Sequence, residues 1–398
     1  MTRSVRPASA ARRLFVLGLA LAGLPTAAAG AAELMIVGND QKVSWNEAGK
    51  PVFAAPGGDT ISIVDIGTDP EAPKIVANLE LMNSILGPPT NLAVTPDGKL
   101  ALAANSMDWV QEGDAWKPSP GNDVYVIDLE ADPPARIATV EAGQQPSGMA
   151  INPAGDLALV ANRAGNSITV LSIEGKEVKP VGTVDMGEQV AAVAFTPDGR
   201  RALAAKFPGH KIALLEVDGQ NVTYGGYDVP VGLWPYNVAV TPDGRLALTA
   251  DNGASGASDG HVDTVSVIDL EADPPRVIDR VVVGDAPEGF AVSPTGGIAV
   301  AVMLKGSAAV PKDAWFANPN GSVVVLKIDG KEVTKVGEVD VGGLPEGVVF
   351  SADGRYLYVG NYVDGDVSIL KVDGTQVTDT GKRLQLPGHP AAMRGAKG

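Results

Sequence analysis

Cysteine is absent from all 398 residues, and histidine occurs only three times. The chain therefore cannot form disulfides, and thiolate ligands or nucleophiles are excluded. Basic residues are also few, 31 against 47 acidic ones, which gives a formal net charge of −16. Such a charge disfavours binding to nucleic acid or to an anionic membrane. We therefore expect a monomer whose partner is a protein or a small molecule.

Long apolar runs are missing apart from one near the N-terminus, at Leu14–Leu24. Four arginines precede this run, and the small-residue stretch "PTAAAGAAE" follows it. That order predicts a removable export signal over residues 1–32, because eleven apolar residues are too few to span a bilayer. The arginine pair in "ARRLFVLG" resembles a twin-arginine signal, so general secretion and twin-arginine export both stay open. Residues 33–398 are then a periplasmic or secreted domain without a membrane span.

Familiar catalytic motifs are missing too. The sequence has no Gly-x-Ser-x-Gly turn, phosphate loop, dinucleotide fingerprint or His-Glu-x-x-His helix. It also lacks Cys-x-x-Cys-His, which excludes covalently attached haem. Among enzymatic functions, metal-assisted hydrolysis or elimination is favoured, since it needs only an ion and one base.

What the chain does contain is a repeated unit. The nonapeptide "VIDLEADPP" occurs at Val126–Pro134 and again at Val267–Pro275. A longer unit recurs around it, as in "PTNLAVTPDGKLALAAN" and "PYNVAVTPDGRLALTAD", and "VSWNEAGKPVFAAP" is a weaker first copy. The turn glycines recur every 44 to 58 residues, from Gly49 to Gly354. This period is typical of radially repeated β-sheets.

Each unit predicts four short strands. An alternating run leads into a Pro-Asp-Gly turn, where Pro restricts φ and Gly accepts a positive φ. Seven such units predict an all-β fold, a seven-bladed β-propeller of four-stranded antiparallel blades, as a single domain over residues 33–398. One blade must join both ends of the chain. Either "LMIVG" (Leu34–Gly38) adds an outer strand to the last blade, or "GHPAAMRG" enters the first.

The segments "YLYVGNYVDGDVSILKVDG" and "LALVANRAGNSITVLSIEG" resemble the YVTN family of β-propeller repeats, a WD40/YVTN-like group. The resemblance covers essentially the whole chain after the signal. It implies the propeller fold, and it implies several functions, because relatives include lactone-hydrolysing enzymes, streptogramin lyases and surface-layer proteins. Fold analogy does not choose among these.

The antiparallel blades sort the loops onto two faces. The Pro-Asp-Gly turns lie on one face, and three long loops, Ser106–Asp123, Asn252–Asp263 and Leu304–Ser322, lie on the other. Two of these loops contain the matching segments "DAWKPSPGND" and "DAWFANPNGS", which predict one loop design used twice. Variable loops on a rigid scaffold usually carry binding residues, so this second face is the predicted functional face.

Aromatic residues on this face are candidate ligand-binding residues. Trp116 and Trp315 lie in the two matching loops, and Trp234 lies in a link between blades. Together they predict an aromatic rim over the channel.

All three histidines also fall on this face. His210 and His261 are candidate general bases, and His389 is a candidate ligand-binding residue.

The starts of the innermost strands ring the central channel. Glu288 and Glu346 occupy equivalent starts on adjacent blades, and Asn91 and Asn237 lie one position later in theirs. Oxygen donors of this kind suit Ca²⁺ or Mg²⁺. The resemblance to lactonase propellers, which use Glu, Asn and Asp around a divalent ion, implies that the two glutamates are metal ligands. No Asp occupies an equivalent start here.

The ends of the second strands carry Asn in several blades, for which we expect local capping of the turn. Lys206 replaces this Asn in the fourth blade, and Arg163 directly follows it in the third. Both are candidate ligand-binding residues.

Three functional hypotheses follow. The first is an exported binding or scaffold protein that engages a small ligand or protein partner through its loop-bearing face. The alternative is a metal-assisted lactone hydrolase or lyase with its site at the central channel. The third is a structural protein of the cell envelope.

Overall fold

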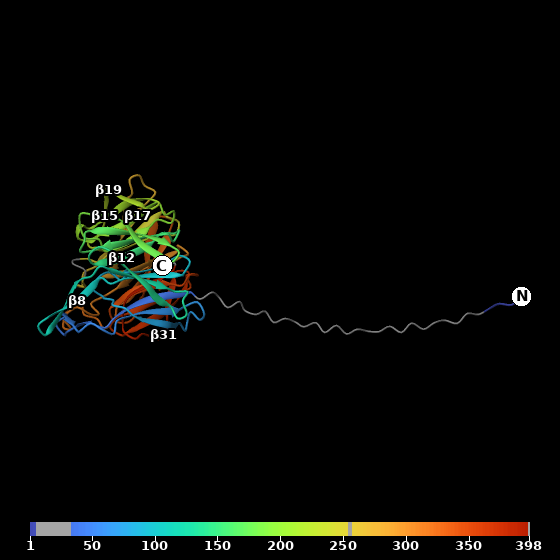
Figure 1. The fold of residues 1–398 in the computed structure, drawn as a ribbon, viewed down its shortest axis with the longest axis horizontal. Helices are drawn as coiled ribbons and strands as arrows, with labels where there is room; N and C mark the ends of the chain where they lie inside the picture. Colours follow the sequence, from blue (N-terminus) through green and yellow to red (C-terminus); the bar gives the residue numbers. More distant parts are fainter. Residues whose placement is uncertain (5–32, 254–256, 397–398) are drawn as a thin grey trace.

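Seven sheets of four antiparallel strands surround a central axis in the computed structural model of this chain, which describes residues 1–4, 33–253 and 257–396 (Figure 1). The seven-bladed propeller predicted from the repeat is confirmed. The predicted export signal lies almost wholly outside the described residues. Within those residues, no helix has the length and apolar character needed to cross a membrane.

The strands of blades 1 to 7 take four positions, counted outward from the axis. The innermost strands are β32 (His389–Gly395), β6 (Leu92–Val94), β12 (Pro146–Ile151), β16 (Val193–Phe195), β20 (Pro235–Val240), β24 (Pro287–Val292) and β28 (Pro345–Phe350). The second strands are β1 (Leu34–Asp40), β7 (Leu100–Ala104), β13 (Leu157–Asn162), β17 (Arg201–Lys206), β21 (Leu246–Asp251), β25 (Ile298–Met303) and β29 (Tyr356–Asn361). The third strands are β4 (Thr60–Asp65), β10 (Asp123–Asp128), β14 (Ser167–Glu174), β18 (Lys211–Asp218), β22 (Asp263–Asp269), β26 (Ser322–Asp329) and β30 (Asp366–Asp373). The outer strands are β5 (Lys74–Glu80), β11 (Ala135–Glu141), β15 (Glu177–Asp185), β19 (Asn221–Pro230), β23 (Arg276–Gly284), β27 (Glu332–Asp340) and β31 (Gln376–Gln385).

The core lies between neighbouring blades. Second strands such as β13 are buried along their whole length, whereas the outer strand β5 alternates exposed and half-buried residues. This difference follows from the geometry, because a second strand is covered by blades on both sides and an outer strand faces water. The predicted turns form as well. Gly98 has a φ of 72°, and Thr95 Oγ1 donates to Asp97 Oδ1 at 2.7 Å.

The C-terminal segment closes the ring. Strand β32 pairs with β1, so "GHPAAMRG" supplies the innermost strand of blade 1 and "LMIVG" supplies its second strand. The red C-terminal strands therefore lie beside the blue N-terminal ones in Figure 1. Of the two closures left open by the sequence, the second is confirmed.

The weak first repeat copy is not part of a blade. Its two runs form a separate hairpin of β2 (Val43–Trp45) and β3 (Pro51–Phe53), inserted between the second and third strands of blade 1. The prediction that Gly49 marks a blade turn is therefore wrong. Gly49 does have a φ of 72°. The local turn was therefore predicted correctly, but its position in the fold was not.

Three insertions on one face form what we call the cap. They are the β2–β3 hairpin, a hairpin of β8 (Met107–Glu112) and β9 (Ala115–Pro120) from blade 2, and the loop Leu304–Ser322 from blade 6. Phe53 packs edge-on against Trp109 with ring centroids 5.2 Å apart, and a β-bridge joins Ala48 to Pro311.

The two matching "DAW" segments do not share a conformation. The first contributes strand β9, whereas Asp313–Gly321 contains turns and no strand. The prediction of one loop design used twice is therefore wrong. Equal spacing into the next strand did not determine the conformation, because the residues before each segment differ. Met107–Glu112 forms strand β8, which pairs with β9 in the same loop. Leu304–Lys312 instead bonds to the β2–β3 hairpin.

A buried lysine anchors the cap to blade 1. Lys42 is 1 % exposed, and its ammonium contacts Asp59, Asp40 Oδ1 at 3.2 Å and the carbonyl of Asn83 at 2.5 Å. The same ammonium lies 5.4 Å from the ring centroid of Trp109. One cation thus joins strand β1, strand β4 and the first two insertions.

Candidate functional site

A ring of seven residues marks the capped mouth of the central channel. Each lies at the second position of the repeat, directly after Pro in six of the seven blades. In blade order the ring is Ala391, Thr90, Ser147, Ala191, Tyr236, Glu288 and Glu346. All seven are buried. Most are small or uncharged, so the two adjacent glutamates stand out.

The backbones of neighbouring innermost strands meet directly beneath this ring. A Cβ atom on Gly289 would lie 2.0 Å from the carbonyl oxygen of Glu346. On the other side of the axis, the amide of Gly148 donates to the carbonyl of Ala191 in the next blade at 2.9 Å. Neighbouring innermost strands therefore touch through their backbones, which only a residue without a side chain permits. We call this level the neck.

Above the neck lies a cavity of about 480 Å³, which we call the upper chamber. Residues of the ring, the inter-blade links and the cap all line it. They include Glu288, Glu346, Arg163, Tyr236, Gln145 and Trp45. Since Trp45, Leu304 and Ala309 come from or flank the insertions, the cap forms part of its wall.

The two glutamates are protonated far more readily than free carboxylic acids. Burial raises the pKa of Glu288 to about 8, partly offset by the Arg163 guanidinium and by Asn252. Burial and the neighbouring Glu288 raise the pKa of Glu346 well above its ordinary value. Oε2 of Glu346 has no hydrogen-bond partner among the described residues. Two like charges so close together cannot both ionise readily, so the pair holds at least one proton at neutral pH.

Two donors face this pair. The Nη1 atom of Arg163 donates to the hydroxyl of Tyr236 at 3.0 Å, and its guanidinium stacks on Phe207 at 4.7 Å from the ring centroid. Burial raises the pKa of Tyr236 to about 12, so its hydroxyl keeps its proton. No carboxylate forms an ion pair with Arg163 in the part of the chain that the structure describes. The chamber thus combines an acid pair with one cation and one hydroxyl.

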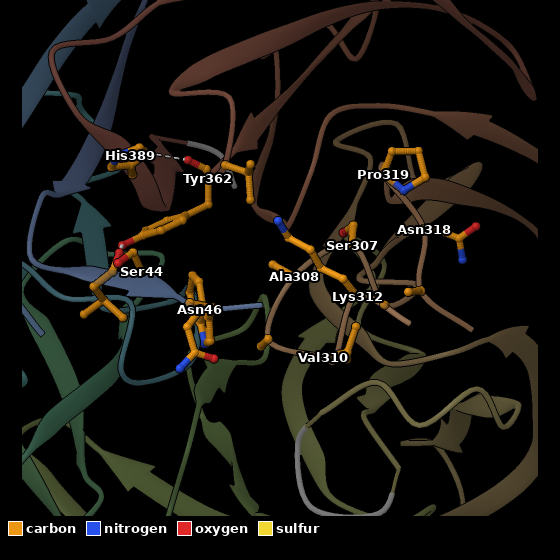
Figure 2. Close-up of a pocket in the computed structure, with 16 residues that line it drawn as sticks. Ser44, Asn46, Ser307, Ala308, Val310, Lys312, Asn318, Pro319, Tyr362 and His389 are labelled. Atoms are coloured by element: carbon orange, nitrogen blue, oxygen red, sulfur yellow. Dashed lines mark hydrogen bonds between the residues drawn. The ribbon is translucent and has the colours of Figure 1, made fainter. Parts of the chain in front are cut away.

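A second cavity, of about 600 Å³, adjoins the upper chamber (Figure 2). Trp45 and Ala309 line both. Figure 2 shows Tyr362 and His389 on one side and Lys312 with Asn318 on the other, so this annex lies between the β2–β3 hairpin and the loop Leu304–Ser322. A ligand held at the glutamates therefore has room to extend beneath the cap.

The histidines do not converge on the glutamates. His210 accepts a hydrogen bond from the amide of Trp234 at 3.0 Å, and the side chain of His261 is 80 % exposed beside Asp259. Neither lines the upper chamber. His389 lines the annex, where it stacks on Tyr362 and its Nδ1 lies 2.6 Å from the Tyr362 carbonyl.

Lys206 and the strand-end asparagines have partners within their own blades. Lys206 contacts Tyr224 at 2.9 Å and Asp228 at 3.3 Å, and it does not line the upper chamber. Asn162 donates to Ser167 and Thr169 on the next strand and accepts from the amide of Gly143. Asn162 therefore ties two strands to the incoming link, whereas Asn105 donates locally to Asp108 at 2.7 Å.

The predicted aromatic rim is dispersed. Trp116 packs in the cap against the Trp109 cluster, and Trp234 packs edge-on against Phe207 at 4.9 Å. Trp315 is 79 % exposed and contacts Phe316. None of the three lines the upper chamber, which Trp45 reaches instead.

The donors around the glutamates do not fit a divalent cation on their own. No group of three or more His, Asp or Glu side chains suited to a metal occurs among the described residues. Asn237 accepts from the amide of Val238 through its Oδ1, and neither it nor Asn91 lines the upper chamber. Arg163 also places a positive charge near the pair. The Ca²⁺ or Mg²⁺ site stays a prediction, and no step of the proposed reaction depends on it.

Tyr236 and Trp45 were missed as site residues. A signal for Tyr236 was available, because it occupies the same repeat position as the glutamates. Trp45 had none, since its hairpin resembled a blade and only the folded chain shows that it reaches across the mouth.

No protein-family model and no curated protein matches this chain, so the likeness to YVTN repeats stays a resemblance. Solved structures do match its fold. The chain is similar to the periplasmic gluconolactonase of Pseudomonas aeruginosa, with 17% identity and a TM-score of 0.64 over 92% of this chain and 99% of that one. It is similar to a protein of Bacteroides uniformis provisionally named a 6-phosphogluconolactonase, with 15% identity and a TM-score of 0.69 over 92% and 99%. It is also similar to Kuenenia stuttgartiensis hydrazine synthase, with 19% identity and a TM-score of 0.57 over 74% and 79%. These similarities establish a seven-bladed propeller with lactonase-like neighbours.

Proposed function

We propose that this protein hydrolyses a small lactone, or a related ester of a polyol, in the upper chamber. The observation that carries the proposal is the buried pair Glu288 and Glu346, whose pKa values are both raised, with Arg163 and Tyr236 lining the same chamber. Paired carboxylates with raised pKa values are suited to general acid–base chemistry near neutral pH. The names of two structural neighbours, both lactonases, support the same reaction class.

Residues of the upper chamber can accept or donate each proton that the hydrolysis transfers. Glu288, whose ionised form the Arg163 guanidinium favours, takes a proton from water as the water oxygen attacks the ester carbonyl. Arg163 and Tyr236 stabilise the negative charge that develops on the carbonyl oxygen. The C–O bond to the ring oxygen then breaks, and protonated Glu346 donates its proton to the leaving alkoxide. The product is a hydroxy acid.

The test of this function is hydrolysis of glucono-δ-lactone. A pH-stat measures the acid that the reaction releases. Glu288→Gln and Glu346→Gln should each lower kcat/KM at least about 100-fold, since each removes a group that transfers a proton. The exposed Glu332→Gln is the matched control and should retain full activity. Activity of the parent should also rise with pH through about 8, where Glu288 ionises. Equal turnover by all four proteins would exclude the proposal, and retained thermal midpoints would show that the losses are not unfolding.

Ligand binding without turnover is the second candidate, and the annex favours it. Its walls combine the Tyr362–His389 stack with Asn46 and Asn318, a mixture suited to a small polar ligand. In this case Ala317→Trp, which fills the annex, should abolish binding of gluconate measured by calorimetry, whereas Glu346→Gln should leave it unchanged. The basic and apolar pattern of residues 1–32 supports an extracytoplasmic location for either function.

A further inference from the structure

The channel has a second chamber on the opposite side of the neck. Its volume is about 260 Å³, and it opens on the face of the Pro-Asp-Gly turns. The innermost strands of six blades line it. Apolar side chains line it together with polar groups, and Val94, Ile151, Phe195, Val240 and Val292 are among the apolar ones. We call this cavity the lower chamber.

One charged side chain enters the lower chamber, that of Arg394 on β32. Its Nε donates to the carbonyl of Leu92 at 3.2 Å. Its two Nη atoms have no hydrogen-bond or ion-pair partner among the described residues. Burial lowers the pKa of Arg394 to about 10, which still leaves the guanidinium charged at neutral pH.

Arg394 is only partly buried, and its partners differ from those of the two buried lysines. Lys42 and Lys206 each contact two carboxylates. Arg394 instead directs a planar fork of donors into the lower chamber. That is the arrangement in which a guanidinium receives a carboxylate in two parallel hydrogen bonds.

We propose that the lower chamber binds a small organic carboxylate, with Arg394 holding the carboxylate and the apolar side chains holding the hydrocarbon body. The ligand enters from the turn face, at the end of the channel opposite the glutamate pair. This site is separate from the glutamate pair and does not depend on the hydrolase proposal.

Hexanoate is the probe, titrated into the full protein by calorimetry, with hexanol as its uncharged counterpart. Saturable one-to-one binding of hexanoate and at least tenfold weaker binding of hexanol are expected. Arg394→Met should weaken hexanoate binding at least tenfold, whereas the exposed Arg276→Met should not change it. Val240→Trp, which fills the chamber and keeps Arg394, should also abolish binding.

Two further measurements separate this site from the upper chamber and from simple ion binding. Glu346→Gln should bind hexanoate as the parent does, since Glu346 does not line the lower chamber. Inorganic phosphate should bind more weakly than hexanoate, because it gains nothing from the apolar side chains. The proposal is overturned if hexanoate does not saturate, if Arg394→Met binds equally well, if Glu346→Gln loses binding, or if phosphate binds more tightly. Unchanged thermal midpoints ensure that a loss reflects the site.

Discussion

The two ends of the central channel are built from the same seven strands and yet differ in almost every property. At one end the strands begin with a ring of side chains, and three insertions build a cap over it. At the other end they run into tight turns of the Thr95–Gly98 type. Long loops accumulate where the chain leaves the second strand, because the short turns on the other face are restricted by their own geometry. The upper chamber, with its glutamate pair, therefore lies at the end of the channel that carries the long loops.

The charges of the two ends differ in the same way. The upper chamber places two acids beside Arg163, whereas the lower chamber places Arg394 among mostly apolar side chains. The two chambers share no lining residue. One channel therefore offers two separate environments, one suited to proton transfer and the other to holding an anion.

Replacing Lys42 beneath the cap and Arg394 in the lower chamber should sharpen this contrast most. Lys42→Met should cost about 3–5 kcal/mol of unfolding free energy, because it leaves Asp40 and Asp59 buried without their cation. Arg394→Met should cost little or stabilise the protein, since no carboxylate loses a partner. Urea denaturation of both variants measures the two effects. Equal losses would mean that Arg394 is as firmly paired as Lys42.

The acid pair should make stability depend on pH. The folded pKa of Glu288, about 8, lies above its ordinary value of 4.5. The folded state therefore binds more protons over this window, and stability is lost as pH rises from about 4.5 to about 8. Glu288→Gln should be free of this loss and gain on the parent by on the order of a few kcal/mol between pH 5 and pH 9.

Thermal midpoints measured across that range check the expectation. The exposed Glu332→Gln serves as control and should follow the parent at every pH. Parallel curves for parent and Glu288→Gln would show that the carboxyl is not held protonated in the folded state.

The neck itself can be tested by adding one methyl group. Gly289→Ala places a Cβ against the backbone of Glu346 and should cost about 1–3 kcal/mol through overpacking. Gly297→Ala, where the added Cβ would meet nothing within 4 Å, should change stability by less than about 0.5 kcal/mol. Chemical denaturation of both variants gives the comparison. Similar small effects would mean that the backbones at Gly289 and Glu346 are not in close contact.

Much of the architecture was predictable because the residues within each repeat indicate where its strands begin and end. The Pro-Asp-Gly turn and the alternation around it indicate a blade from local residues alone, and the prominence of Glu288 and Glu346 came from comparing equivalent positions. Prediction failed where local pattern and tertiary role differ. Around Gly49 the pattern imitates a blade turn, yet the residues belong to an inserted hairpin.

The amino-acid sequence by itself determined six of the blade turns and the ring position of the two glutamates, because these depend on short-range periodicity that recurs along the chain. Only the tertiary structure decided that β32 closes blade 1, that Trp45 reaches the upper chamber while the predicted tryptophans do not, and that Arg394 lacks a partner. Those features depend on contacts between residues far apart in the chain. Burial raises the pKa of Glu288 for the same reason, since blades and cap must assemble before water is excluded.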